Sequence, residues 1–371
     1  MDKEQISSVQ LGLMMYLMVG GTSILVVPSF TAMFAGQDMW ISPILGSIFG
    51  VVNVWIAWRI HRMHPGKTWI QQVKGVFGRV LGNVICAIII FFQIDAIGLI
   101  TREYAEFIVQ AFLSQTPLVM IIACIVLTCS FAVRSGVEVI GRFALIFGPI
   151  FFLFVLAIFL FLMPEYRFSN ILPVFGKGIN PALKGSLEPS LWFMEFWFIS
   201  SFYPLVRKED NGLKAGIFAV LFMMLTMALT NFTCLFMYGE ATANLTFPFL
   251  SASRYINISD FFSHVEAIVM ALWILGGFVQ ISMWYFTLVQ STSQWLKLKD
   301  YRLLVFPVGL LIGGFSIWVA KNFQQMLQFF PTGGAGYSIC FLFLFPILLL
   351  MAAWIRRKIA SWRKIGSIVR K

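Results

Sequence analysis

The sequence is poor in charged residues. Only 12% of its 371 residues are Asp, Glu, Lys or Arg, whereas a soluble domain usually carries about 25%. Hydrophobic residues make up 59% of the chain. So little charge excludes an ordinary soluble enzyme or binding domain and predicts a membrane protein.

Cysteine and histidine are also scarce. The five cysteines all lie in apolar stretches without CxxC spacing, and the three histidines have no spacing that suits a metal. The sequence contains no HExxH motif, P-loop, nucleophile elbow or cysteine–histidine pair. We therefore expect no disulfide, no metal site, no cofactor and no enzymatic activity.

What the chain does have is a succession of long apolar runs. A helix needs roughly 20 apolar residues to cross a bilayer. The opening Met1-Asp2-Lys3-Glu4 lacks the positive stretch of a cleavable signal, so we expect the first run to be retained. The predicted spans are 9–33, 41–60, 82–112, 117–133, 142–163, 186–206, 213–237, 265–294, 303–320 and 332–355. We expect an all-α polytopic membrane protein with a single transmembrane domain over 1–371.

The basic residues predict an orientation. Most of the 27 Lys and Arg residues fall on one face of the predicted topology, including the tail 356–371. The positive-inside rule then makes both termini cytoplasmic. The net charge of +11 therefore requires no nucleic-acid partner, because it faces the lipid bilayer. The basic tail is read first as a topogenic signal, and second as a docking site for a partner.

The two halves of the chain have similar layouts, repeat one at about 9–163 and repeat two at about 186–355. Each half has five spans, so the second must enter the membrane from the opposite side, which predicts a five-plus-five inverted repeat. The first span contains Gly20, Gly21, Thr22 and Ser23 near its middle, and the sixth reads SLWFMEFWFISSFYP. We expect both helices to be broken there, with a binding site at the bilayer midplane where they meet.

Two carboxyl groups lie near the centres of spans. Asp95 is in span three and Glu195 in span six. A charge in hydrocarbon costs at least about 2.5 kcal/mol, so such residues are candidates for function. The alternative is that each is protonated, or hydrogen-bonded to backbone freed by the breaks. The neighbouring side chains expected to wall a small polar cavity are Phe92, Trp192, Phe193, Gln280 and Trp284. Lipid contact or core packing is the alternative for any single ring.

A break in the first helix would suit a carboxylate ligand. Freed N–H groups and the positive end of the helix dipole would face it, and Thr22 and Ser23 would add donors. Carbonyls freed in span six, with Glu195 nearby, would receive an ammonium group. The sequence therefore predicts a small zwitterion as ligand, with the backbone near Gly20 and Gly21 as its contact.

A further charged group lies in TREYAEF, toward the outer end of span three. Arg102 and Glu106 are four residues apart and can pair on one helix face. We interpret Arg102, Glu103 and Glu106 mainly as a structural ion network near the outer interface. The alternative is that they line an entrance.

At these residues the chain resembles the B subunits of spore germinant receptors, the GerAB/GerKB family. The most specific stretches are ISSVQLGLMMYLMVGGTSILVVPS, TREYAEFIVQAFLSQTPLVMI and NILPVFGKGINPALKGSLEPSLWFMEFWFISSFYP. The resemblance implies the LeuT-like fold of the amino acid–polyamine–organocation transporter superfamily. It also implies a nutrient sensor in the spore inner membrane that works with an A subunit and a lipoprotein C subunit. The family pocket, carried onto this chain, would include Gly21, Phe92, Trp192, Glu195, Gln280 and Trp284.

Two functions remain open at this point. The first is a receptor subunit that binds a nutrient, expected to be an amino acid, and signals to its partners to trigger germination. The second is a proton- or cation-coupled amino acid transporter, with Asp95 or Glu195 as the protonatable group.

Overall fold

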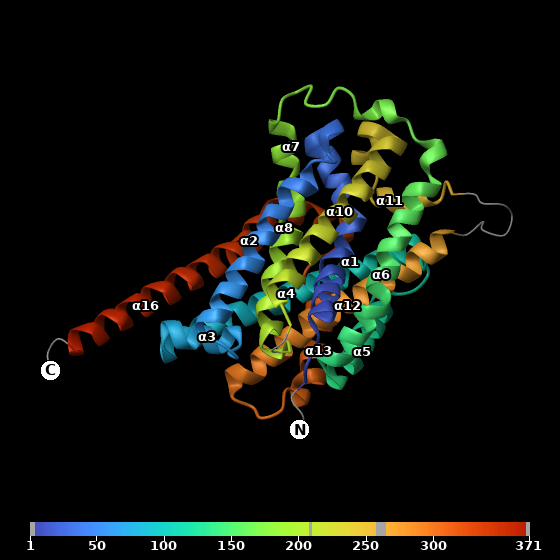
Figure 1. Ribbon diagram of the computed structural model, residues 1–371. Helices are drawn as coiled ribbons and strands as arrows, with labels where there is room; N and C mark the ends of the chain where they lie inside the picture. Colours follow the sequence, from blue (N-terminus) through green and yellow to red (C-terminus); the bar gives the residue numbers. More distant parts are fainter. Residues whose placement is uncertain (1–3, 208–209, 257–264, 369–371) are drawn as a thin grey trace.

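Helices form almost all of the regular structure in the described residues, 4–207, 210–256 and 265–368 of a computed structural model (Figure 1). Within these ranges nine helices are long and apolar enough to cross a membrane. An interrupted segment at 187–205 is the tenth. Each predicted span overlaps one of these ten segments, so the predicted all-α polytopic architecture is confirmed.

The uninterrupted spans are α1 (Ser8–Ala35), α2 (Ser42–Met63), α4 (Arg79–Ala111), α5 (Leu118–Ser135), α6 (Val137–Phe161), α10 (Gly212–Tyr238), α12 (Val265–Leu296) and α13 (Val305–Trp318). The sixth span consists of α8 (Leu187–Met194), η4 (Glu195–Phe198), α9 (Ile199–Phe202) and η5 (Tyr203–Leu205). The tenth consists of α14 (Phe323–Phe329), η8 (Phe330–Gly334), α15 (Ala335–Ile339), η9 (Cys340–Leu344) and α16 (Phe345–Ile368). The connections contain η1 (Gly36–Asp38), α3 (Trp69–Phe77), η2 (Met163–Glu165), η3 (Phe168–Ile171), α7 (Asn180–Gly185), η6 (Gly239–Asn244), α11 (Pro248–Ser253) and η7 (Tyr301–Leu304). His264 and part of the connection that contains it lie outside the described residues.

Helix α1 forms the centre of the bundle and is continuous. It packs against α10, α12 and α6. In its most hydrophobic stretch of 18 residues, 89% of the residues are buried. Ser7 and Gln10 form a capping box at its start. The predicted break at Gly20 and Gly21 is wrong, because α1 remains α-helical over Ser8–Ala35.

The glycines of α1 serve close packing instead. A Cβ atom on Gly21 would lie 2.5 Å from Gln280 Oε1 and 2.6 Å from the Tyr104 hydroxyl. Gly276 of α12 packs directly on the Gly21 Cα, and a Cβ on Gly277 would lie 2.2 Å from the Tyr104 ring. Small residues let two buried helices approach this closely. The cost of glycine in a helix is therefore offset by contact between α1, α4 and α12.

The sixth span is irregular where the sequence predicts it. The α-helix of α8 ends at Met194, and the next four residues, beginning with Glu195, form the 3₁₀ turn η4. Asn53 of α2 donates one hydrogen bond of 2.7 Å to the Met194 carbonyl and another of 2.7 Å to the Leu342 carbonyl in η9. One side chain thus satisfies the irregular backbone of spans six and ten.

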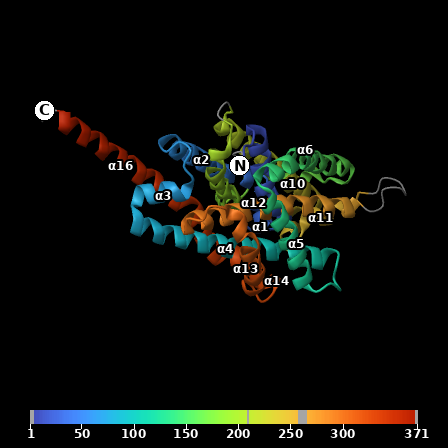
Figure 2. The same ribbon diagram turned by 90° about the horizontal axis from the view of Figure 1, so that it is seen from below.

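The tenth span contains two π-helical segments, η8 and η9, on either side of the short helix α15. Such widened turns occur frequently at functional sites. Beyond them α16 runs away from the bundle, past α3 (Figures 1 and 2). Arg356 joins these two elements by donating to the carbonyls of Gly75 and Val76.

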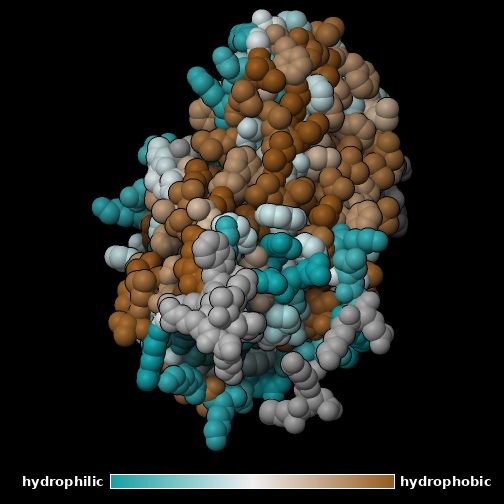
Figure 3. Space-filling model, turned by 60° about the vertical axis from the view of Figure 1, so that its left-hand side comes forward, coloured by the Kyte–Doolittle hydropathy of each residue, from teal (hydrophilic) through white to brown (hydrophobic). Residues whose placement is uncertain are grey.

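The surface agrees with a membrane location. On the face drawn in Figure 3, hydrophobic residues cover most of the upper and middle parts, and hydrophilic residues gather toward the lower end. Lipid-facing side chains such as Ile88, Leu310 and Trp318 are exposed, as expected for helices surrounded by hydrocarbon.

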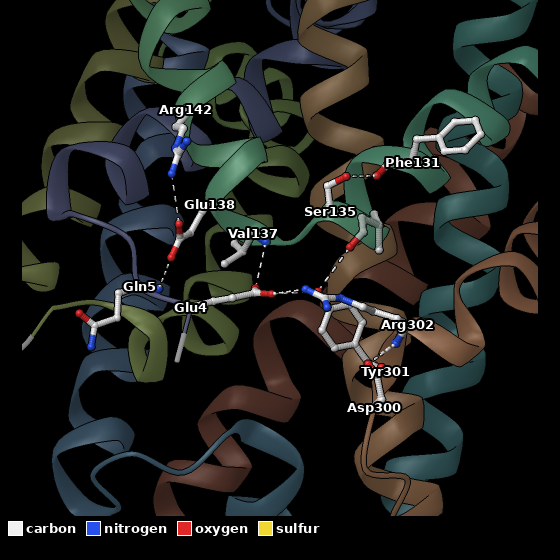
Figure 4. Close-up of polar contacts among 11 residues, drawn as sticks. Glu4, Gln5, Phe131, Ser135, Val137, Glu138, Arg142, Asp300, Tyr301 and Arg302 are labelled. Carbon is white, nitrogen blue, oxygen red and sulfur yellow. Dashed lines mark hydrogen bonds and ion pairs between the residues drawn. The ribbon is translucent and has the colours of Figure 1, made fainter. Parts of the chain in front are cut away.

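The N-terminal segment contacts the start of α6 and the segment between α12 and α13 (Figure 4). The Glu4 carboxylate accepts hydrogen bonds from the Val137 amide at 3.1 Å and the Tyr301 hydroxyl at 3.3 Å, and pairs with Arg302 at 3.4 Å. Ile6 then pairs with the end of span six, donating to the Leu205 carbonyl. We call residues 4–6 the N-terminal clasp.

Candidate functional site

A small cavity of about 70 Å³ lies between α1, α4, α12 and the irregular parts of spans six and ten. Roughly five water molecules would fill this volume, at 10–15 Å³ each. The cavity thus lies among the first, third, sixth and eighth spans, and the tenth span forms an additional wall. Its polar side chains are Thr22, Asp95, Glu103, Glu195, Tyr337 and Ser338.

Thr22 joins three of the surrounding spans. Its hydroxyl oxygen accepts hydrogen bonds from Trp192 Nε1 at 2.9 Å and from Gln280 Nε2 at 3.1 Å. All three side chains are buried. Thr22 thereby fixes Trp192 of α8 and Gln280 of α12 against α1 at the edge of the cavity.

Three carboxyl groups face the cavity. Asp95 and Glu103 lie on one face of α4, with Asp95 beside the Tyr337 hydroxyl. Glu195 begins η4 and accepts a hydrogen bond of 3.4 Å from Trp284 Nε1. Glu103 is only 2% exposed, and its Oε1 atom has no hydrogen-bond partner among the described residues. Glu103 and Glu195 thus share the wall of one cavity.

Aromatic rings form much of the remaining wall. Phe92 lies 6.3 Å from Trp284, centroid to centroid, and 4.9 Å from Tyr337. Trp192 and Phe330 lie 6.0 Å apart on another side. The cavity wall thus combines carboxyl groups with aromatic rings.

Six of the predicted site residues line the cavity: Thr22, Phe92, Asp95, Trp192, Glu195 and Trp284. Gln280 lies next to it through its bond to Thr22, and Gly21 packs against Gln280 and Tyr104. The cavity wall does not include the other three, Gly20, Ser23 and Phe193.

Each of these three has a different environment. Gly20 faces Met223 of α10 and Phe151 of α6. Phe193 faces α2, where a Cβ on Gly50 would lie 3.1 Å from its ring. Ser23 is buried, and its hydroxyl has no partner among the described residues. Sequence proximity to the break did not reveal which helix face each side chain occupies.

Glu103 and the tenth span are the parts of the site that the sequence interpretation missed. Arg102 and Glu106 form the predicted pair at 2.8 Å, but Glu103 points into the cavity. The spacing of Phe92, Asp95 and Glu103 places them on one helical face and offered a signal for it. For the tenth span the only signal was the irregular stretch PTGGAGYS before a uniformly apolar run.

Comparison with known proteins identifies the family. The sequence model of the family described as spore germination protein, or spore permease, matches residues 5–324. The chain belongs to this spore permease family. It is 27% identical to spore germination protein KB of Bacillus subtilis (strain 168), over 96% of this chain and 97% of that protein. It is 26% identical to spore germination protein YndE of the same organism, over 95% and 94%.

Solved structures show which fold this chain adopts. It superposes on MhsT in complex with L-phenylalanine with a TM-score of 0.63 and 12% identity, over 95% of this chain and 99% of that one. The TM-score to Mhp1, a nucleobase-cation-symport-1 family transporter, is 0.61 at 10% identity, over 94% and 78%. These similarities establish the LeuT-like fold, as the sequence predicts. The curated relatives are named as spore germination proteins, and Mhp1 is a transporter that shares only the fold.

Proposed function

We propose that this spore permease is the ligand-sensing B subunit of a spore germinant receptor. Its ligand would be a small nutrient, an amino acid or a derivative that keeps the amino group. The observation that carries the proposal is the cavity between α1, α4, α12 and the irregular spans six and ten. Family membership supplies the germination context.

The geometry supports a sensing role because the cavity contacts helices of both halves. Thr22 belongs to the first half, and its two hydrogen-bond donors belong to the second. A ligand that binds better to one arrangement of these helices shifts the population toward that arrangement. Partner subunits that contact these helices would respond to the change in their arrangement.

The proposed surroundings are the spore inner membrane, with both termini cytoplasmic. The A and C subunits would be the partners, and the ligand would reach the cavity from the outer side. Copurification of the A and C subunits with a tagged chain from spore membranes tests this assembly.

A cavity-filling variant tests the function. Ala96 lines the cavity, so Ala96→Trp should raise the nutrient concentration for half-maximal germination at least about tenfold in a strain that carries only this receptor. Ile88→Trp is the matched control, because Ile88 lies two turns away on the same helix and is 50% exposed. Single nutrients are screened first to find the responsive one. An unchanged response of Ala96→Trp spores with normal protein levels would refute the proposal.

The second candidate is a proton- or cation-coupled amino acid transporter. The similarity to MhsT in complex with L-phenylalanine favours it, together with the buried carboxyl groups of the cavity. Purified protein in liposomes would then accumulate a labelled amino acid when a proton gradient is imposed. Binding without accumulation would favour the receptor.

A further inference from the structure

The ionisable groups that line the cavity are all acidic apart from the Tyr337 hydroxyl. Asp95, Glu103 and Glu195 lie in its wall, and none of the described wall residues is Lys, Arg or His. The nearest basic residue along α4 is Arg102, which is already paired with Glu106 at 2.8 Å and donates to the Ser316 carbonyl. The protein therefore offers a carboxylate ligand no cation in this cavity.

The backbone does not supply the missing positive charge. Because α1 is continuous, its N–H groups near Gly20 and Gly21 belong to the helix. The backbone site that the carboxylate of a zwitterion would need is therefore used by α1 itself.

The Glu103 side chain indicates which kind of ligand group the cavity would accept. It is 98% buried, lines the cavity, and has an oxygen without a partner among the described residues. A buried ionised group without a partner is costly, and an ammonium group would supply both charge and hydrogen-bond donors. The wall also contains the aromatic rings of Trp192, Trp284 and Phe92, and a cation is attracted to the face of such a ring.

We infer that this cavity binds a small organic cation through its ammonium group and disfavours ligands that carry a free carboxylate. The inference rests on the proposed function, since it names the ligand class of the same cavity. An α-amino amide or a simple amine should bind better than the corresponding amino acid.

Three matched probes test the charge preference. L-Alaninamide, L-alanine and L-lactamide have similar size but are cationic, zwitterionic and neutral at pH 7. The same series is made on the valine and phenylalanine scaffolds. Affinities are measured by isothermal titration calorimetry on the full chain in nanodiscs. On at least one scaffold, the cationic amide should bind at least about tenfold more tightly than both matched probes.

A pair of variants locates the effect. Glu103→Gln should weaken binding of the cationic amide at least about tenfold. Glu188→Gln is the matched control, because Glu188 is equally buried and lies outside the cavity wall. If a variant fails to fold, the order of the three probe affinities on the unsubstituted protein still tests the inference.

The outcomes separate this inference from the proposed function. Equal or tighter binding of the amino acids, equal binding of the neutral amides, or no binding of any cationic amide would overturn the ammonium preference. The proposed function would still stand if Ala96→Trp and Ile88→Trp spores differed in germination. If those spores behave alike, the sensing role fails, whatever the probe ranking.

Discussion

At the scale of single residues, the Thr22 hydroxyl has the most partners at the cavity. It is the acceptor for Trp192 Nε1 and Gln280 Nε2. Thr22→Val keeps the shape but leaves both buried donors unpaired, at about 1–3 kcal/mol each. We expect a loss of about 2–4 kcal/mol in the free energy of unfolding, measured by denaturant titration in mild detergent. Thr128→Val, at an exposed site on α5, should change it by less than about 0.5 kcal/mol.

Gly21 provides a second prediction at this scale. In Gly21→Ala the new Cβ would clash with Gln280 and the Tyr104 hydroxyl, which should cost about 1–3 kcal/mol as overpacking. Gly336→Ala on α15 is the control, because no atom lies within 4 Å of its Cβ position. Both variants gain the helix preference of alanine, so their difference isolates the clash. Equal thermal stability of the two would show that α1 and α12 are not packed this tightly.

At the scale of elements, the site depends on two irregular spans being held in register. Asn53 of α2 binds both the Met194 and the Leu342 carbonyls. Asn53→Leu leaves two buried acceptors unpaired, so we expect a loss of about 2–4 kcal/mol in stability. It should also reduce the germination response, because Glu195 follows Met194 directly. Asn83→Leu, at a half-buried position on α4, should leave the germination response unchanged.

The N-terminal clasp is an element with a different energetic role. Glu4 and Arg302 are partly exposed, at 25% and 35% of their side chains, and such ion pairs contribute less than about 1 kcal/mol. Glu4→Ala should therefore leave global stability nearly unchanged and speed hydrogen exchange at the Val137 amide, whose acceptor it removes. Exchange at Val137, measured by mass spectrometry, should stay unchanged in Glu165→Ala, because Glu165 lies in η2, beyond the other end of α6. Unaltered exchange at Val137 would contradict the role of the clasp.

At the scale of the whole molecule, the positive-inside rule predicts one orientation. Lys67, between α2 and α3, is exposed and should face the cytoplasm, whereas exposed Lys177 should face outward. In intact cells a membrane-impermeant maleimide should label Lys177→Cys and should label Lys67→Cys only after permeabilisation. The unsubstituted chain is the control for labelling of its own cysteines. The reverse pattern would invert the topology and place the basic end of the molecule outside.

Much of the fold follows from the sequence because bilayer insertion is decided by local properties. A run of about 20 apolar residues spans the hydrocarbon wherever it occurs, so the ten spans could be found one by one. Charge is expensive in hydrocarbon, which singled out Asp95 and Glu195. Both line the cavity.

The direction in which a side chain points is a property of packed helices. Phe193 and Trp192 are neighbours in the sequence, yet Phe193 faces α2 and Trp192 faces the cavity. The sequence also could not predict that the tenth span lines the cavity, because its wall residues lie in an apolar run that contains no charged residue.

The sequence by itself determined the class of protein, the number and order of its spans and the irregular sixth span, and it singled out two carboxyl groups that line the cavity, because these depend on hydrophobic length and the cost of buried charge. Only the tertiary structure decided what the glycine pair does. It let Gly21 pack against α12 within a continuous helix, since Gly276 and the Tyr104 side chain, far along the chain, need the space that a Cβ would fill. It also placed Glu103 in the cavity wall, as a third carboxyl group beside Asp95 and Glu195.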